Sequence, residues 1–386
     1  MKIEVAKADL ESALAIAGIA TATNGADLST HYLFRLKDGQ VEVLSASERV
    51  FARAPMVTSV EGDDGDAFTI EAWRLNKWIS GVSDGVLKLS ADGGGDVHAS
   101  GPRSKVRFRS LDPSKFPYWD GLEASSEDVG TIDPRALSRA LSVSRWFVSA
   151  DDTSKPELCQ VEAVDGVLWA TDRRALSSVE MPLLPELNIR IPGKQVAAVV
   201  RFLNEKGSVE TDITVRQASR SVDDGGGAHC TLVRADGAYV GVTRPTSSFP
   251  TFNVDREAED DSKLEIDQAE FLSAIAVLTA GAPKGHESVT FSYDHKEKEV
   301  KLTMPCEAGG EDEYPLSLAK VTNGEKWVKP FTVDYPYING IGSTFGLDSL
   351  TFGVNERGRG GFISFRHNDE EGKNGNRYFS VIVWRT

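Results

Sequence analysis

The sequence lacks the features that mark several classes of protein. Its three cysteines, Cys159, Cys230 and Cys306, include no CxxC pair, so neither a disulfide framework nor a cysteine-based zinc site is expected. No stretch approaches the roughly 20 apolar residues that a membrane helix needs, and the N-terminus alternates charged and apolar residues, unlike a signal peptide. We therefore expect a soluble cytoplasmic protein whose fold begins at the first residue.

Positive charge is also scarce. The 386 residues include 58 acidic and 43 basic side chains, for a net charge of -15. This balance excludes a protein whose whole surface binds nucleic acid or an anionic membrane, but it allows a basic surface enclosed by an acidic exterior. The length exceeds that of a single core, so two or three domains of roughly 100–200 residues are expected.

Motifs of enzymes and metal sites are missing or misplaced. The string GVSDG at residues 81–85 matches the hydrolase motif G-x-S-x-G, yet Ser83 follows an expected helix and precedes an expected strand, the reverse of a nucleophile elbow. The glycine runs DGGGD and DDGGGAH lie between expected strands, which favours hairpin turns over phosphate loops. The histidines have no metal-ligand spacing. We expect no enzyme, metal or cofactor, and a hydrolase using Ser83 remains only a rival hypothesis.

The chain does contain an internal repeat. An apolar anchor residue is followed by apolar residues five, eight and nine positions later in five copies, and five and eight positions later in a sixth. The spacing of the later residues places them on one face of a helix, and each anchor closes a short alternating segment. Alternating runs with turn residues follow, so each copy predicts a β-α unit and about three further strands. The anchors are Val5, Ile70, Ile132, Ile191, Ile266 and Val333, spaced 59 to 75 residues apart.

Local signals support these helices and group them. Asp133 before Pro134 is typical of an N-cap followed by proline at the first helical position, and Asp267 with Glu270 has capping-box spacing. The strings SKFPYW and SSFPTF each precede an acidic stretch typical of a linker. The six units therefore predict three domains of two units each, because pairing two units buries the apolar face of both. The predicted domains are 1–122, 130–254 and 263–386.

With this organisation the chain resembles the bacterial-type DNA sliding clamp, the beta subunit of DNA polymerase III, over its full length. The strings that carry the resemblance are MKIEVAKADLESAL, LDPSKFPYWD, LWATDRRAL, SSFPTF and VIVWRT, in this order. The resemblance implies an α+β fold of three tandem clamp domains, with sheets outside and helices lining the channel of a ring-shaped, head-to-tail homodimer. It also implies a non-catalytic processivity factor of DNA replication that encircles duplex DNA and tethers the polymerase at the replisome.

The helices that would line the channel are less acidic than the chain as a whole. The fourteen residues after each anchor contain eight basic and nine acidic side chains in total, and several of the acids occupy cap positions. Contacts with DNA phosphates would be independent of sequence and sensitive to salt. The candidate DNA-binding residues are Lys7, Arg74, Lys77, Arg135, Arg139, Arg145, Lys155, Lys194 and Arg201.

The third predicted domain departs from this pattern. The helix after Ile266 has no basic residue, and the segment after Val333 contains Pro336, Gly340 and Gly342, so its role in lining a channel is open. Tyr335 and Tyr337 either contact DNA there or pack within the protein, and packing is the favoured interpretation.

The resemblance further implies a pocket between the second and third domains that receives short peptide motifs of the polymerase, the clamp loader and repair proteins. An apolar chain end agrees with a groove there. The string DRRAL and Trp384 depart from the usual family residues, so we expect a shifted motif preference; the alternative is that Leu176 and Val383 are ordinary core residues. The carried-over pocket residues are Thr171, Asp172, Arg174, Leu176, Pro250, Ile382, Val383, Trp384 and Arg385.

Two further questions stay open at the level of sequence. The uneven basicity of the expected channel helices also fits a clamp-like interaction or decoy platform that does not encircle DNA. The departures from the family pattern fit either a phage-encoded clamp or a second cellular clamp, and the residues do not choose between them.

Overall fold

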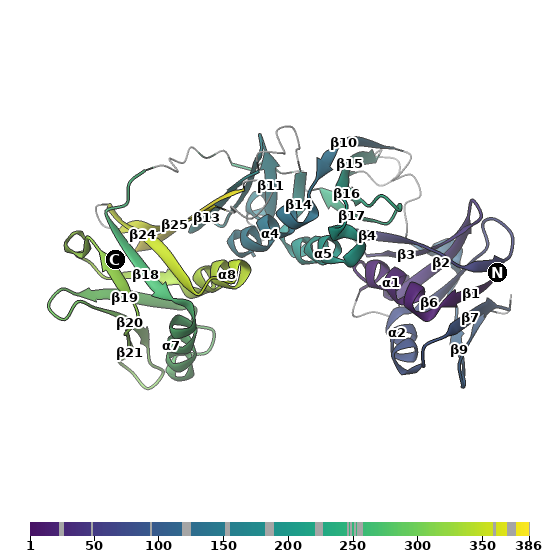
Figure 1. Cartoon of the computed structure of the whole chain (residues 1–386), viewed down its shortest axis with the longest axis horizontal. Coiled ribbons are helices and arrows are strands. Elements are labelled where there is room, and N and C mark those ends of the chain that lie inside the picture. The colour runs from purple at the N-terminus through teal and green to yellow at the C-terminus, as the bar shows by residue number, and fades with distance from the viewer. Residues whose placement is uncertain are drawn as a thin grey trace. The chain divides into compact units, whose positions relative to one another are not determined.

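The structure is a computed structural model of the chain (Figure 1). It divides into two compact units. Unit 1 comprises Met1–Ser138 and Arg190–Thr246, and unit 2 comprises Arg139–Ile189 and Ser247–Thr386. The predicted three-domain division stays a prediction. The described residues are 1–22, 27–47, 49–92, 95–117, 125–150, 155–181, 189–220, 227–244, 247, 249–250, 252, 258–357, 360–368 and 376–385.

Each of the six predicted copies of the repeat folds as a strand, a helix and three strands. The first copy is β1 (Lys2–Ala6), α1 (Lys7–Ala17), β2 (His31–Lys37), β3 (Gln40–Ala46) and β4 (Val50–Met56), followed by the short β5 (Ser59–Glu61). The second is β6 (Ala67–Glu71), α2 (Ala72–Gly81), β7 (Val86–Ala91), β8 (Asp96–Gly101) and β9 (Ser104–Arg109). The third is β10 (Ser126–Ile132), α4 (Pro134–Ser144), the 3-10 turn η3 (Arg145–Phe147), β11 (Gln160–Val164), β12 (Val167–Thr171) and β13 (Ala175–Glu180).

The remaining copies follow the same order. The fourth is β14 (Ile189–Pro192), α5 (Gly193–Asn204), the short α6 (Lys206–Val209), β15 (Ile213–Arg220), β16 (Gly227–Val233) and β17 (Tyr239–Arg244). The fifth is β18 (Ser262–Asp267), α7 (Gln268–Gly281), β19 (Ser288–Asp294), β20 (Glu299–Pro305) and β21 (Glu311–Leu316), followed by β22 (Lys320–Thr322). The sixth is β23 (Phe331–Asp334), α8 (Tyr335–Phe345), β24 (Ser349–Arg357), β25 (Gly360–Asn368) and β26 (Arg377–Arg385).

The repeat pattern marks the core. All six anchors are buried, and in α1 the residues five, eight and nine positions after Val5, namely Leu10, Ala13 and Leu14, are buried as well. Each fully buried leucine contributes about 2 kcal/mol of hydrophobic free energy. The apolar pattern therefore marks the buried face of α1, and the regular succession of strands and helices in the six copies confirms the predicted α+β fold class.

Unit 1 contains two antiparallel sheets. One has the order β5-β1-β7-β8-β9, and the other has the order β10-β15-β16-β17-β4-β3-β2-β6. In the second sheet β17 pairs with β4, with Tyr239 opposite Arg53, so strands of the fourth copy continue the sheet of the first. Beneath this junction the buried carboxylate of Glu42 lies 2.9 Å from the guanidinium of Arg35 and 2.5 Å from that of Arg53.

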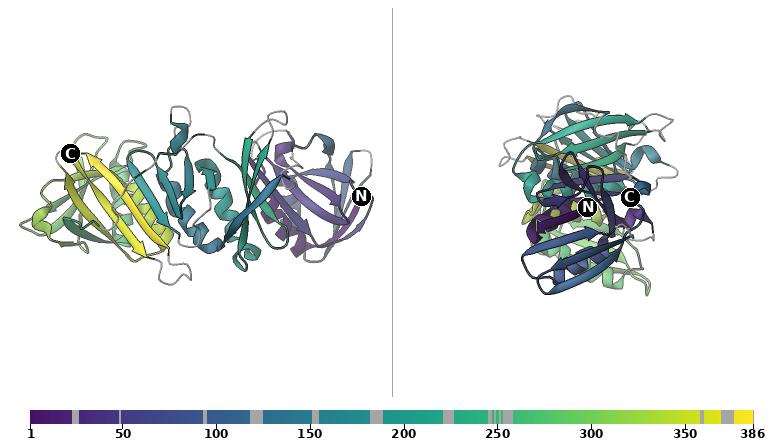
Figure 2. Two further views of the ribbon diagram at one scale, coloured as in Figure 1. Left: turned by 90° about the horizontal axis from the view of Figure 1, so that it is seen from above. Right: turned by 90° about the vertical axis from the view of Figure 1, so that its right-hand side faces the viewer.

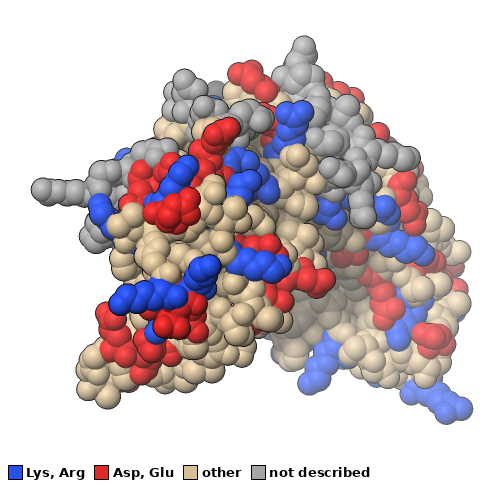
Figure 3. All heavy atoms as spheres, turned by 60° about the vertical axis from the view of Figure 1, so that its left-hand side comes forward, with Lys and Arg blue, Asp and Glu red and all other residues tan. Residues whose placement is uncertain are grey.

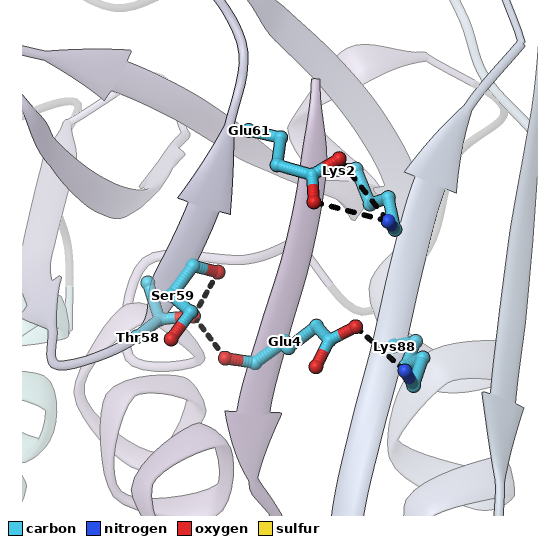
Figure 4. Close-up of polar contacts among 6 residues, drawn as sticks. All are labelled: Lys2, Glu4, Thr58, Ser59, Glu61 and Lys88. Atoms are coloured by element: carbon cyan, nitrogen blue, oxygen red, sulfur yellow. Dashed lines mark hydrogen bonds and ion pairs between the residues drawn. The ribbon is translucent and has the colours of Figure 1, made fainter.

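The outer face of the smaller sheet carries a ladder of polar side chains around β1 (Figure 4). Lys2 lies 3.1 Å from the carboxylate of Glu61 on β5, and Glu4 accepts a hydrogen bond of 2.6 Å from Lys88 on β7. Ile3 and Val5 alternate with them and are buried. The two-residue period of the strand thus separates a solvated face from the core.

Unit 2 is built on one large antiparallel sheet. Strand β13 pairs with β26 over Ala175 to Glu180, which joins strands of the third copy to the last strand of the chain. Beyond β26 the order continues through β23, β19 and β20 to the terminal β21, while β24 and β25 pair alongside β26. Figure 2 shows β24, β25 and β26, in green to yellow, as neighbouring strands of one layer.

The internal repeat extends to single hydrogen bonds. In unit 2 the backbone N–H of Val383 on β26 donates to the carbonyl of Arg174, at the turn before β13, over 2.8 Å. In unit 1 the N–H of Thr243 on β17 donates to the carbonyl of Arg49, at the turn before β4, over 3.0 Å. The β13–β26 junction and the β4–β17 junction therefore share the same backbone hydrogen bond.

The predicted helix caps are confirmed, with one difference. The carboxylate of Asp133 accepts hydrogen bonds from the N–H groups of Arg135 and Ala136, and that of Asp267 accepts one from Glu270. The carboxylate of Glu270 instead accepts from the N–H groups of Ser317 and Leu318. The capping-box spacing thus identified the cap correctly, but the Glu270 side chain ties α7 to the segment after β21.

The Ser83 segment, rejected as an enzyme motif, has the expected structure, because Ser83 lies between the end of α2 and the start of β7. The two glycine runs fall largely on residues 93–94 and 221–226, which lie outside the described residues. Cys230 is buried, while Cys159 and Cys306 are partly exposed, and none of the three is in a disulfide. In the part of the chain that the structure describes, no helix is long and apolar enough to cross a membrane.

Candidate partner pocket and candidate DNA-binding helices

A pocket of about 300 Å³ lies within unit 2 beside the junction of β13 and β26. Its wall comes from the ends of β23 and β26, the start of α8 and the turn between β12 and β13. The arrangement combines an apolar wall with charged and hydroxyl groups, which suits an extended peptide segment. The lining residues are Arg173, Arg174, Ser288, Thr332, Val333, Asp334, Tyr337, Ile382 and Val383.

The turn that carries the two arginines is shaped by Thr171 and Asp172. The Asp172 carboxylate accepts hydrogen bonds from the N–H groups of Arg174 and Ala175, at 2.8 and 2.9 Å, as in an Asx turn. The Thr171 hydroxyl donates to the carbonyl of Ala175 over 2.7 Å, and Arg173 has a left-handed backbone with φ of 78°. This turn holds Arg173 and Arg174 at the pocket instead of letting them extend β13.

The polar groups of the pocket are tied to one another. Asp334 accepts a hydrogen bond of 2.6 Å from the Ser288 hydroxyl and forms an ion pair with Arg174 at 3.3 Å. The hydroxyl of Tyr337 donates to the Asp172 carboxylate, and its ring stacks on Phe147 with centroids 5.3 Å apart. Burial and the hydrogen bond to Asp172 raise the pKa of Tyr337, so its hydroxyl stays protonated. Tyr337 is buried, which agrees with the packing interpretation of this tyrosine.

The carried-over pocket residues fall into three groups. Arg174, Ile382 and Val383 line the pocket; Val383 is 52% exposed, so it is not a core residue. Thr171 and Asp172 form the turn behind it, and Leu176, opposite Val381, is not among the lining residues.

The other three carried-over residues are not among the described residues that line the pocket. Pro250 follows Phe249 and is not among the lining residues, and the ring of the nearby Phe252 packs on Trp169 with centroids 6.0 Å apart. The side chains of Trp384 and Arg385 lie outside the described residues.

Sequence reasoning missed most of the pocket wall, although Val333 is the anchor of the sixth copy. The lining residues that were not assigned to it are Arg173, Ser288, Thr332, Val333, Asp334 and Tyr337. Strand β23 pairs with both β19 and β26, and it therefore brings the sixth anchor, Val333, beside the chain end. The position of this anchor in the repeat was the sequence signal that could have indicated these residues.

Most of the candidate DNA-binding residues lie on helices with their side chains in solvent. Lys7 differs, because it is only 14% exposed, donates to the carbonyl of Val82 over 2.8 Å and pairs with Glu11 and Asp84. Lys155 is half-buried beside the 3-10 turn Pro156–Leu158. The exposed candidates are Arg74 and Lys77 on α2, Arg135 and Arg139 on α4, Arg145 on η3, and Lys194 and Arg201 on α5.

The helices of the last two copies carry no such basic side chains. In α7 the exposed large residues are apolar, with Leu272 39% and Val277 57% exposed. In α8 two glycines allow neighbouring side chains to approach the helix closely: a Cβ on Gly340 would clash with Trp146, and one on Gly342 would clash with Gln268. The unusual composition of α8 thus reflects close packing within unit 2.

Charge on the surface of the described residues is mixed. On the face that Figure 3 shows, Lys and Arg side chains alternate with Asp and Glu side chains. Among the described residues, no group of three or more His, Cys, Asp or Glu side chains is arranged to hold a metal ion. The pocket and the exposed basic helices are the features that carry the predicted binding residues.

Comparison with known proteins identifies the fold. No protein-family model matches the sequence, and no curated protein matches it by sequence. The chain is similar over all of its length to the DNA polymerase III beta subunit of Thermotoga maritima, with 16% identity, a TM-score of 0.77 and 99% of that chain covered.

Two further solved structures give the same result. One is the DnaN sliding clamp of Bartonella birtlesii bound to griselimycin, with 17% identity, a TM-score of 0.76 and 100% of this chain and 99% of that chain covered. The other is the DNA polymerase sliding clamp of Bacillus subtilis, with 13% identity, a TM-score of 0.73 and the same shares covered. The chain therefore has the fold of the sliding clamps, in a form that has diverged far in sequence.

Proposed function

We propose that the protein is a DNA sliding clamp, a ring that encircles duplex DNA and tethers a replicative polymerase to it. The observation that carries the proposal is the match of the whole chain to sliding-clamp structures. The exposed lysines and arginines of α2, α4 and α5 support it, because scattered cations on helices give phosphate contacts that hold DNA without reading its sequence. Nothing in the proposal requires catalysis.

The pocket of unit 2 is the proposed docking site for partner peptides of the polymerase and the clamp loader. Val383 offers an exposed apolar surface at its rim, and β23 and β26 contribute an open wall for an extended segment. Arg173 and Arg174 add positive charge, which favours peptides with an acidic residue near an apolar anchor. Both arginines stand where the sequence departs from the family pattern, so the preferred motif is expected to differ from that of other clamps.

Ring closure is proposed to join two chains head to tail through the terminal strands of their sheets. Strand β9 ends the smaller sheet of unit 1 and exposes Lys105, Arg107 and Arg109. Strand β21 ends the sheet of unit 2 and exposes Glu311 and Glu313. The basic β9 edge of one copy is therefore complementary to the acidic β21 edge of a second copy. Pairing of the two strands would cover both exposed edges.

The test measures solution mass and topological retention together. Light scattering should give the mass of two chains, and protein loaded on nicked circular DNA should leave only after the DNA is cut to a linear form. A monomer that leaves both DNAs at the same rate would overturn the proposal. A dimer that is never retained on circular DNA would favour the second candidate, an interaction platform that does not encircle DNA, for which the lack of any basic residue on α7 is the supporting observation.

A further inference from the structure

Trp73 is an exposed tryptophan on α2 that does not belong to the core. Its side chain is 55% exposed, whereas Leu75 and Ile79 on the same helix are buried. The indole N–H donates to the carboxylate of Glu71, which also forms an ion pair of 2.7 Å with Arg74. The ring is therefore held in place at the surface.

Two cations lie against the same ring. The guanidinium carbon of Arg74 is 5.2 Å from the ring centroid of Trp73, and the ammonium of Lys77 is 5.9 Å from it. Both distances are within the range of cation–π attraction. Since Arg74 is itself 60% exposed, the three side chains form an exposed aromatic surface with positive charge beside it.

The internal repeat relates this position to two of the candidate DNA-binding residues. Trp73 stands three residues after its anchor Ile70, where the third copy has Arg135 and the fourth has Lys194. Arg135 and Lys194 are exposed, so the position faces solvent in all three helices. Only in the second copy does an aromatic side chain replace the cation.

We propose that Trp73, Arg74 and Lys77 form a contact for single-stranded nucleic acid, in which an unpaired base stacks on the indole and the two cations meet the adjoining phosphates. Aromatic side chains beside positive charge are the usual means of holding single strands without sequence preference, because every base has a face that can stack. In a duplex those faces are covered by neighbouring base pairs, so the indole discriminates between the two forms. The inference rests on the proposed clamp function only in placing α2 beside DNA.

The test compares one labelled oligonucleotide, single-stranded and annealed to its complement, by fluorescence anisotropy at low ionic strength. Trp73→Ala should weaken single-strand binding by about fivefold to 150-fold, the range expected for loss of one base–aromatic stack, and should change duplex binding by less than about twofold. Trp73→Phe keeps an aromatic face and should retain most of the affinity. Arg135→Ala, at the matched position of the third copy, should weaken both forms alike because it removes a phosphate contact.

Two results would overturn the inference: an equal loss of single-strand and duplex affinity in Trp73→Ala, or no loss of either. Circular dichroism and solution mass show whether each variant keeps its fold. The oligonucleotide assay needs no ring loading, so failure of the wild-type protein to stay on circular DNA would count against the clamp function and leave the single-strand contact standing.

Discussion

Gly340 on α8 lies directly against the indole ring of Trp146: a Cβ at position 340 would come within 2.4 Å of two ring carbons. The contact brings α8 onto η3, and the hydroxyl of Thr344 adds a hydrogen bond of 3.5 Å to the carbonyl of Ser142. Glycine has low helix propensity, but at this position it permits the packing of the helix.

Gly340→Ala is therefore expected to destabilise the protein by about 1–3 kcal/mol, because the added methyl group must displace a packed indole. The gain in helix propensity, up to about 1 kcal/mol, does not offset this. Gly81→Ala is the matched control: Gly81 is also helical, but no atom lies within 4 Å of the added Cβ. Urea unfolding should show Gly81→Ala as stable as the wild type or more so, and equal effects of the two substitutions would contradict the packing argument.

Much of the fold could be predicted from the sequence because its signals are local and repeated. Each anchor such as Val5 or Ile266 sits where a strand gives way to a helix, so the period of apolar residues changes there. Contacts between copies have no such signal. Two examples are the packing of Trp146 on Gly340 and the hydrogen bonds that Glu270 accepts from Ser317 and Leu318. These residues are far apart in the sequence, and the identity of a tryptophan or a glutamate does not indicate which residue it contacts.

The candidate site was predictable to a similar extent. The resemblance to sliding clamps assigned Ile382 and Val383 to the pocket, the apolar character of the chain end agreed with it, and both residues line the pocket. Lys7 was grouped with the candidate DNA-binding residues on charge and helical position alone. Its side chain instead reaches the carbonyl of Val82 and the carboxylate of Asp84, which lie beyond the end of α2, and only the folded packing of the two copies shows this.

Cys230 should be unreactive in the folded protein. Burial raises the pKa of its thiol to about 12, so almost no thiolate is present at neutral pH. Iodoacetamide should modify the partly exposed Cys159 and Cys306 in the native state, and Cys230 only in urea, as mass spectrometry would show. Because the raised pKa belongs to the folded state, the stability contribution is present below the ordinary thiol pKa, near 9, and declines as pH rises above it. Rapid native labelling of Cys230 would contradict this.

Glu42 is expected to be essential for stability. Its carboxylate is 2% exposed and pairs with both Arg35 and Arg53, so Glu42→Gln removes one side of a buried ion pair and should cost about 3–5 kcal/mol. Glu61→Gln is the control, because its pair with Lys2 is at the surface, with 78% of the Glu61 side chain exposed. That variant should lie within about 0.5 kcal/mol of the wild type in the same denaturation experiment. Similar losses in both variants would show that Glu42 is not specially placed.

Val383→Glu should abolish binding of partner peptides without unfolding the protein. The side chain is 52% exposed at the pocket, so a carboxylate is tolerated there but removes the apolar contact and adds charge beside Asp334. Val328→Glu introduces the same change at a residue that is 67% exposed and is not among the pocket-lining residues. Calorimetric titration with a peptide from the cognate polymerase should detect binding to the control only. Undiminished binding to Val383→Glu would place the peptide site elsewhere.

The proposed ring interface can be tested by exchanging its charges. Glu311→Lys with Glu313→Lys makes β21 basic, so it should repel the basic β9 of a second copy and raise the dimer dissociation constant by at least about tenfold. Adding Lys105→Glu and Arg107→Glu to the same chain reverses both edges and should restore the dimer. Glu297→Lys with Glu325→Lys, two exposed acids away from either edge, changes net charge equally and should leave association nearly unchanged. Analytical ultracentrifugation over a range of ionic strength would distinguish the three cases. If the control weakened the dimer as much as the β21 variant, overall charge and not the pairing of these edges would govern assembly.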